Sequence, residues 1–153
     1  MLDLYRFKQY VLNENFLFNK SVIKDTANEV IIQAIENMGS YKMKIFISCD
    51  CYGLTQVEFV TVPIIKKTPE FFDAEIDLRF YLSRFSDRDN LFMVNSKNIN
   101  GVNHYSLLFN DSKLRRNIKT SEDACNYVKE AYNCMFYNTS VKGYLNKVVE
   151  TLR

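Results

Sequence analysis

The sequence contains no tryptophan, two prolines, four glycines and one histidine in 153 residues. Neither the P-loop nor the Gly-x-Gly-x-x-Gly pattern occurs, so the glycine-rich loops that cradle nucleotide phosphates are absent. A single histidine excludes the nucleases, phosphodiesterases and metal sites that require two. The Glu-x-Lys pattern of restriction-type nuclease cores is missing after Glu58 and Glu75. Several common enzyme classes are therefore excluded.

Long apolar runs are also missing. Residues 1–18 carry Asp3, Arg6, Lys8 and Glu14, and so lack the uninterrupted apolar segment of a signal peptide. No apolar run approaches the ~20 residues that a membrane-spanning helix requires. We therefore expect a soluble intracellular protein, in the cytoplasm of the producing or host cell, with no membrane partner.

The four cysteines predict structural thiols. Cys49 and Cys51 are separated by one residue, which is tighter than the usual spacing of zinc ligands. Cys125 and Cys134 are nine positions apart, which on a helix is a rotation of ~900° and places them on opposite edges. We expect thiols without disulfides, two or more of them buried and structural, and neither a metal nor a cofactor.

Length and composition indicate one ordinary globular domain spanning residues 1–153. Hydrophobic residues make up 47% of the chain and charged residues 25%, which is typical of such domains. The net charge of +2 excludes a strongly acidic DNA mimic and does not by itself indicate a nucleic-acid partner. Sixteen asparagines against five alanines indicate AT-rich coding, as in a virus, a phage, a low-GC bacterium or a protist.

The first forty residues predict helices. Between Leu2 and Leu12, a helical face and a strand-like alternation are both present, and we favour a helix with Asp3 as its N-cap. Ser21–Met38 predicts a second helix, which Gly39 would end. Its apolar stripe comprises Ile23, Ala27, Val30, Ile31, Ala34, Ile35 and Met38.

The period then changes to two, which predicts strands. Residues 42–49 place Met43, Ile45, Ile47 and Cys49 on one side. Residues 55–65 follow, with Pro63 marking an edge position or a bulge near the end of that strand. Residues 74–85 are compatible with a helix or a strand, and their unbroken alternation favours a strand. We further expect strands at 91–94 and 102–109, with a turn at 95–101. About five strands joined by short links indicate an antiparallel meander.

The C-terminal part predicts two amphipathic helices. Thr120 or Ser121 caps the first, with Glu122 and Asp123 in its first turn, where the helix dipole favours negative charge. Residues 141–152 form a second apolar stripe. The expected fold class is therefore α+β: a mainly antiparallel sheet of about five strands, an N-terminal helical part and two C-terminal helices.

Two carboxylates and the lone histidine are the candidates for chemistry. Glu75 and Asp77 alternate with apolar residues, so they belong to the solvent face of a strand or, in the alternative, to an unrecognised active site near His104. No Gly-x-Ser-x-Gly pattern accompanies the histidine. We assign no catalytic and no metal-binding residue.

Lys113, Arg115, Arg116 and Lys119 form the one concentrated basic run. This segment is either a solvated connector or a loop that holds a phosphate backbone or an acidic protein surface. We expect Leu114 and Ile118 to anchor it to the core. Four further lysines would enlarge the patch if they lie nearby: Lys42, Lys44, Lys66 and Lys67.

Tyrosines outside the apolar stripes are candidates for binding, because exposed tyrosine is common at protein interfaces. The four candidates are Tyr41, Tyr52, Tyr81 and Tyr137. Three hypotheses follow: a non-enzymatic interaction protein, for instance a viral or phage accessory protein that inhibits a host factor; a nucleic-acid-binding protein using residues 113–119; and an enzyme. The last helix is also a candidate homodimer surface.

Overall fold

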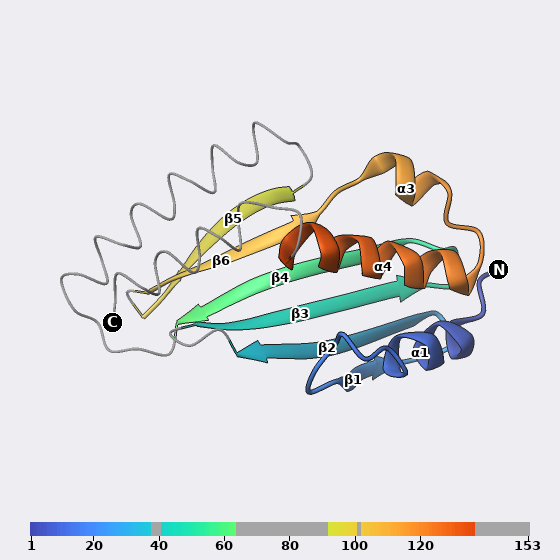
Figure 1. Cartoon of the computed structure of the whole chain (residues 1–153), viewed down its shortest axis with the longest axis horizontal. Helices are drawn as coiled ribbons and strands as arrows, with labels where there is room; N and C mark the ends of the chain where they lie inside the picture. Colours follow the sequence, from blue (N-terminus) through green and yellow to red (C-terminus); the bar gives the residue numbers. More distant parts are fainter. Residues whose placement is uncertain (38–40, 64–91, 101, 137–153) are drawn as a thin grey trace.

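The structure is a computed structural model that describes residues 1–37, 41–63, 92–100 and 102–136. Six strands form one sheet in the order β1-β2-β3-β4-β6-β5, and every neighbouring pair is antiparallel. The helices α1 (Leu4–Leu12) and α4 (Ser121–Phe136) lie side by side on one face of this sheet (Figure 1). The α+β class and the antiparallel sheet are confirmed.

Helix α1 begins where the sequence predicts. The Asp3 carboxylate accepts a hydrogen bond from the backbone N–H of Arg6 at 3.1 Å, which caps the first turn. Leu4, Phe7 and Val11 are the buried face of the helix. The helical pattern therefore outweighs the alternation in this segment.

The predicted helix at Ser21–Met38 is wrong. Residues 21–37 form a hairpin of β1 (Ser21–Asp25) and β2 (Glu29–Asn37). Thr26 organises the turn, because its Oγ1 accepts hydrogen bonds from the backbone N–H groups of Asn28 and Glu29. The segment is rich in β-branched residues, and β2 pairs with β3 over nine consecutive residues; this tertiary pairing overrides the helical spacing.

The strands β3 (Tyr41–Asp50) and β4 (Thr55–Pro63) confirm the period-two segments. Met43, Ile45, Ile47 and Cys49 are all buried on the helix-covered face. Pro63, which predicted an edge position or a bulge near the end of this strand, is the last residue of β4 and pairs with Tyr41. β4 is nevertheless an interior strand, between β3 and β6.

The predicted turn at 95–101 is mostly wrong. β5 is Phe92–Ile99 and pairs with β6 (Val102–Phe109) over its whole length, so residues 95–99 are strand and, of the described residues, Asn100 alone is turn. The predicted short strand at 91–94 is thus the first half of a longer one. Because β6, not β5, lies beside β4, the sheet also departs from a simple meander. The strand predicted at 74–85 lies outside the described residues.

A short helix, α3 (Ser112–Arg116), precedes α4. The start of α4 is confirmed: Thr120 Oγ1 accepts from the N–H of Asp123, whose carboxylate accepts from the N–H groups of Lys119 and Thr120. The predicted apolar stripe of α4 is buried. The helix predicted at 141–152 lies outside the described residues.

The core lies between the sheet and the two long helices. Phe59 in β4 packs edge-on against Phe92 of β5 and Phe136 of α4, with ring centroids 6.1 and 6.0 Å apart. Thr61 contributes the core's central polar contact, because its Oγ1 accepts a hydrogen bond from the N–H of Tyr105 at 3.1 Å. In the described part, the core thus joins elements from both ends of the chain.

Candidate functional site

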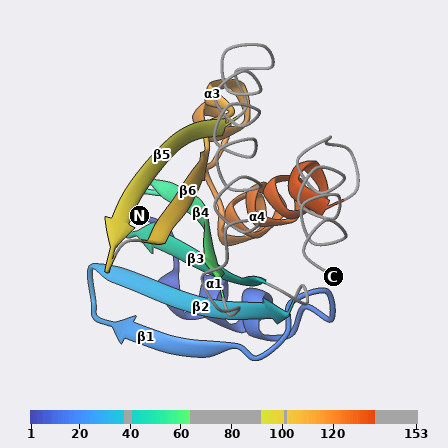
Figure 2. The ribbon, with the colours of Figure 1, turned by 90° about the vertical axis from the view of Figure 1, so that its left-hand side faces the viewer.

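The sheet has a second face, opposite α1 and α4, which we call the outer face (Figure 2). Burial alternates along most of β2, β3, β4 and β6: residues buried under the helices alternate with residues that are partly or fully exposed. The outer face therefore meets solvent with side chains that a rigid sheet holds in place.

Apolar side chains form the middle of the outer face. Phe46 on β3 lies between Gln33 and Glu58 on the neighbouring strands, and Glu58 in turn pairs with Leu108 of β6. Leu108 pairs with Met93, which is 49% exposed. This row crosses from β2 to β5 and carries one charge, Glu58.

One end of the outer face is basic. Lys42 and Lys44 lie on β3, and Lys97 pairs with His104 across β5 and β6. Lys42 and Lys97 are exposed and Lys44 is half-buried. The ion pairs among the described residues involve other lysines, so these three lysines have no acidic partner within that part of the chain.

The pKa of His104, which lies at the basic end of the outer face, is lowered. Partial burial is the main cause that lowers its pKa, and the positive charge of Lys44 lowers the pKa further. The imidazole is therefore neutral at pH 7. Because the unfolded chain takes up this proton more readily, the group destabilises the fold as the pH falls below about 6.5.

The substitution Lys44→Gln should raise the pKa of His104 towards its ordinary value, because it removes the nearby positive charge. The single histidine of the sequence makes an NMR titration of its ring protons unambiguous. Lys113→Gln, on the separate helix α3, is the matched control and should leave the titration unchanged. An unaltered His104 pKa in Lys44→Gln would mean that the two groups do not interact.

The basic run at 113–119 is partly helical and not a plain loop. Lys113, Arg116 and Lys119 are exposed, as predicted for a binding surface, whereas Arg115 is half-buried. The Nε and Nη2 atoms of Arg115 are inaccessible to solvent and make no hydrogen bond. Burial raises the pKa of Tyr127, and the positive charge of Arg115 lowers that pKa, so the two side chains are close together. Arg115 therefore belongs to the packing between α3 and α4 and is not displayed to solvent.

Leu114 and Ile118 were both predicted to anchor the basic run to the core, and this is confirmed for one of them. Ile118 packs against the core, but Leu114 is 37% exposed. Lys42 and Lys44 do not enlarge the patch, because they belong to the first residues of β3, and this strand begins at the end of the sheet far from α3 (Figure 1). Lys66 and Lys67 lie outside the described residues.

Tyr52, one of the four tyrosines predicted as binding candidates, is displayed to solvent. It occupies the β3–β4 turn and is 84% exposed. The adjacent Gly53, with φ +90°, lies close to the carbonyl oxygen of Ile118, so the turn and the basic run are neighbours. Tyr41 is the first residue of β3. Tyr81 and Tyr137 lie outside the described residues.

The enzyme hypothesis places a site near Glu75, Asp77 and His104. Glu75 and Asp77 lie outside the described residues, so the described structure does not test whether these three side chains meet. Within the described ranges, no three His, Cys, Asp or Glu side chains converge to hold a metal ion. All four cysteines are buried and free, whereas the sequence indicated burial for two or more of them. Burial is the main cause that raises the pKa of Cys49, Cys125 and Cys134 to about 11, so these thiols are protonated at neutral pH.

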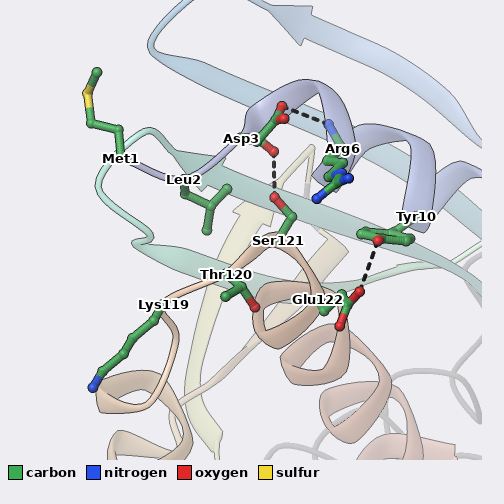
Figure 3. A pocket seen from close by; sticks show the side chains of 9 residues that line it. All are labelled: Met1, Leu2, Asp3, Arg6, Tyr10, Lys119, Thr120, Ser121 and Glu122. Atoms are coloured by element: carbon green, nitrogen blue, oxygen red, sulfur yellow. Dashed lines mark hydrogen bonds between the residues drawn. The ribbon is translucent and has the colours of Figure 1, made fainter.

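A cavity of about 320 Å³ lies where α1 and α4 begin (Figure 3). Its polar groups largely satisfy each other: Ser121 Oγ donates to the Asp3 carbonyl oxygen at 2.6 Å, and the Tyr10 hydroxyl donates to the Glu122 carboxylate at 3.1 Å. Lys119 extends away from these groups. The contacts hold the two helices together, which is a structural role.

Sequence reasoning missed the outer face as a binding surface. The signal was present in residues 42–49, whose alternation places Lys42, Lys44 and Phe46 on the side opposite the buried residues. Lys97 gave no such signal, because its segment was assigned to a turn. Only the pairing of β5 with β6 places it beside His104.

Comparisons with known proteins add no relative: no family model, no curated protein and no solved structure matches this chain. In the residues that the structure describes, no helix is both long and apolar enough to cross a membrane.

Proposed function

We propose that the protein is a non-enzymatic interaction module that binds an acidic partner protein on the outer face of its sheet. One observation carries the proposal: partly exposed apolar side chains lie on the same rigid face as lysines whose charge is not neutralised in the described structure. An intracellular viral or phage accessory protein that inhibits a host factor would have use for such a surface, and the AT-rich composition fits that origin.

The apolar side chains and the lysines of the outer face would contribute differently to binding. Phe46, Val60 and Leu108 offer apolar area whose side chains are already ordered by the sheet, so little entropy is lost on binding. Lys42 and Lys44 would attract an acidic partner and orient it, because complementary charge mainly sets the association rate and specificity. Glu58 is the one acidic residue in the apolar row.

Nucleic-acid binding is the second candidate, and it uses a different surface. Lys113, Arg116 and Lys119 are exposed beside the turn that carries Tyr52, which combines positive charge with an aromatic ring. Such binding would weaken steeply with salt, because phosphate contacts release counterions. The two surfaces lie at opposite ends of the sheet, so they can be tested separately.

The test is quantitative capture of the tagged protein's partners from a plausible host lysate, with and without nuclease, for the wild type and two variants. One variant carries Lys42→Glu, Lys44→Glu and Lys97→Glu; the other carries Lys113→Glu, Arg116→Glu and Lys119→Glu. Both lower the net charge equally. We expect the outer-face variant to lose roughly tenfold or more of a nuclease-resistant protein partner, and the α3 variant to retain it.

Three other results would contradict this function. Prey that disappears with nuclease and with the α3 variant would support nucleic-acid binding. Equal loss in both variants would indicate a response to net charge, without a defined surface. Capture that recovers no partner would favour the enzyme hypothesis, and a thermal-shift screen of small molecules would follow.

A further inference from the structure

The two edges of the described sheet differ in how they are protected against pairing with another strand. β1 is five residues long, its register shifts between Val22 and Lys24, and it carries the charged residues Lys24 and Asp25. Short length, a bulge and charge are common devices that prevent edge-to-edge pairing. β5 is eight residues long, keeps unbroken register with β6 and carries one charge, Lys97.

Hydrogen bonds in the sheet show which backbone groups of β5 point away from β6. The N–H of Tyr105 donates to Thr61 Oγ1, and this hydroxyl donates to the Tyr105 carbonyl oxygen, so both backbone groups of Tyr105 are directed towards β4. Tyr105 is the partner of Ser96 in the β5–β6 pairing. The backbone N–H and C=O of Ser96, and of Val94 two residues before it, therefore point outwards.

The exposed side chains of β5 are placed symmetrically about Ser96. Met93 lies three residues before it and Ile99 three residues after it, both on the outer face, with exposed fractions of 49% and 43%. In an antiparallel pairing centred on Ser96, Met93 of one copy meets Ile99 of the other. Asn95 meets Lys97 in the same way, so no like charges are directly opposite.

We propose that the protein forms a two-fold homodimer by antiparallel pairing of two β5 edges, centred on Ser96. The partner is a second copy because the edge is complementary to itself, as a two-fold interface requires. The pairing would join two sheets and their outer faces into one continuous surface. It does not depend on the proposed partner binding, because it can be measured on the purified protein alone.

The decisive experiment is sedimentation equilibrium of the wild type and two double variants. Met93→Lys with Ile99→Glu places opposite charges across the interface, whereas Met93→Lys with Ile99→Lys places like charges there. Within one copy the two positions are ~20 Å apart, so the monomer should not distinguish the variants. We expect wild type and the Lys/Glu variant to dimerise, and the Lys/Lys variant to bind itself roughly tenfold more weakly than the Lys/Glu variant.

A backbone variant provides an independent measurement. Ser96→Pro removes the outward N–H at the centre of the interface and leaves the hydrogen bonds with β6 intact, a substitution that edge strands tolerate. It should be monomeric with an unchanged melting temperature, and Ile23→Lys on β1 should still dimerise. A wild type that remains monomeric, or a dimer that persists equally in both double variants, would overturn the proposal.

Discussion

The substitution Phe59→Ala should destabilise the protein by about 3–5 kcal/mol, the largest effect expected of any single change considered. Phe59 is fully buried at the centre of β4, and its ring packs against Phe92 and Phe136. Truncation removes apolar burial and leaves a cavity among residues from three separate elements. Because those neighbours belong to strands and a helix, they cannot collapse freely into the space.

Chemical denaturation with urea measures this loss, and Phe46→Ala is its matched control. Phe46 lies on β3, two strands from β6, on the outer face and only partly buried. Its removal should cost much less, because the space it leaves opens to solvent and creates no cavity. Equal losses for Phe46→Ala and Phe59→Ala would contradict the assignment of the two sheet faces.

The substitution Thr61→Val should destabilise the protein by about 1–3 kcal/mol although the side chain keeps its size. Thr61 is fully buried, and its hydroxyl both accepts from the N–H and donates to the carbonyl oxygen of Tyr105. Valine would leave these two backbone groups without that partner in the core. The hydrogen bonds to the hydroxyl offset part of the cost of desolvating these groups, and valine would remove that contribution.

Thr61→Ser separates the hydroxyl from the methyl group. Serine retains the hydrogen bonds and loses one buried methyl, so its cost should stay near 1 kcal/mol. The measurement is again the free energy of unfolding from urea titration, with the slope checked for constancy. A serine variant less stable than the valine variant would show that packing at this position outweighs its hydrogen bonds.

These two predictions bear on function because they concern the face of the sheet that the helices cover. The core holds β3, β4 and β6 in register, and that register places Lys44 near His104 and Phe46 beside Glu58 on the outer face. Substitutions at Phe59 or Thr61 should therefore act through stability. Substitutions at Lys42 or Lys44 should act on binding with little loss of stability, since surface charges contribute little.

The sequence by itself determined the features that depend on neighbouring residues. The cap at Asp3, the alternation along residues 42–49 and the capping pattern of Thr120 and Asp123 are local, because each rests on contacts within a few positions. Free thiols, two or more of them buried, were likewise predicted from spacing and composition, and all four are buried. These features led to the correct fold class.

Only the tertiary structure decided the rest. Residues 21–37 have helical spacing but form two strands, because pairing with β3 satisfies a whole row of backbone groups. β6 lies between β4 and β5, and this order brings Lys97 to His104 and leaves β5 at the edge of the described sheet. Strand pairing joins residues far apart in the chain, so local periodicity cannot reveal which side chains share the outer face.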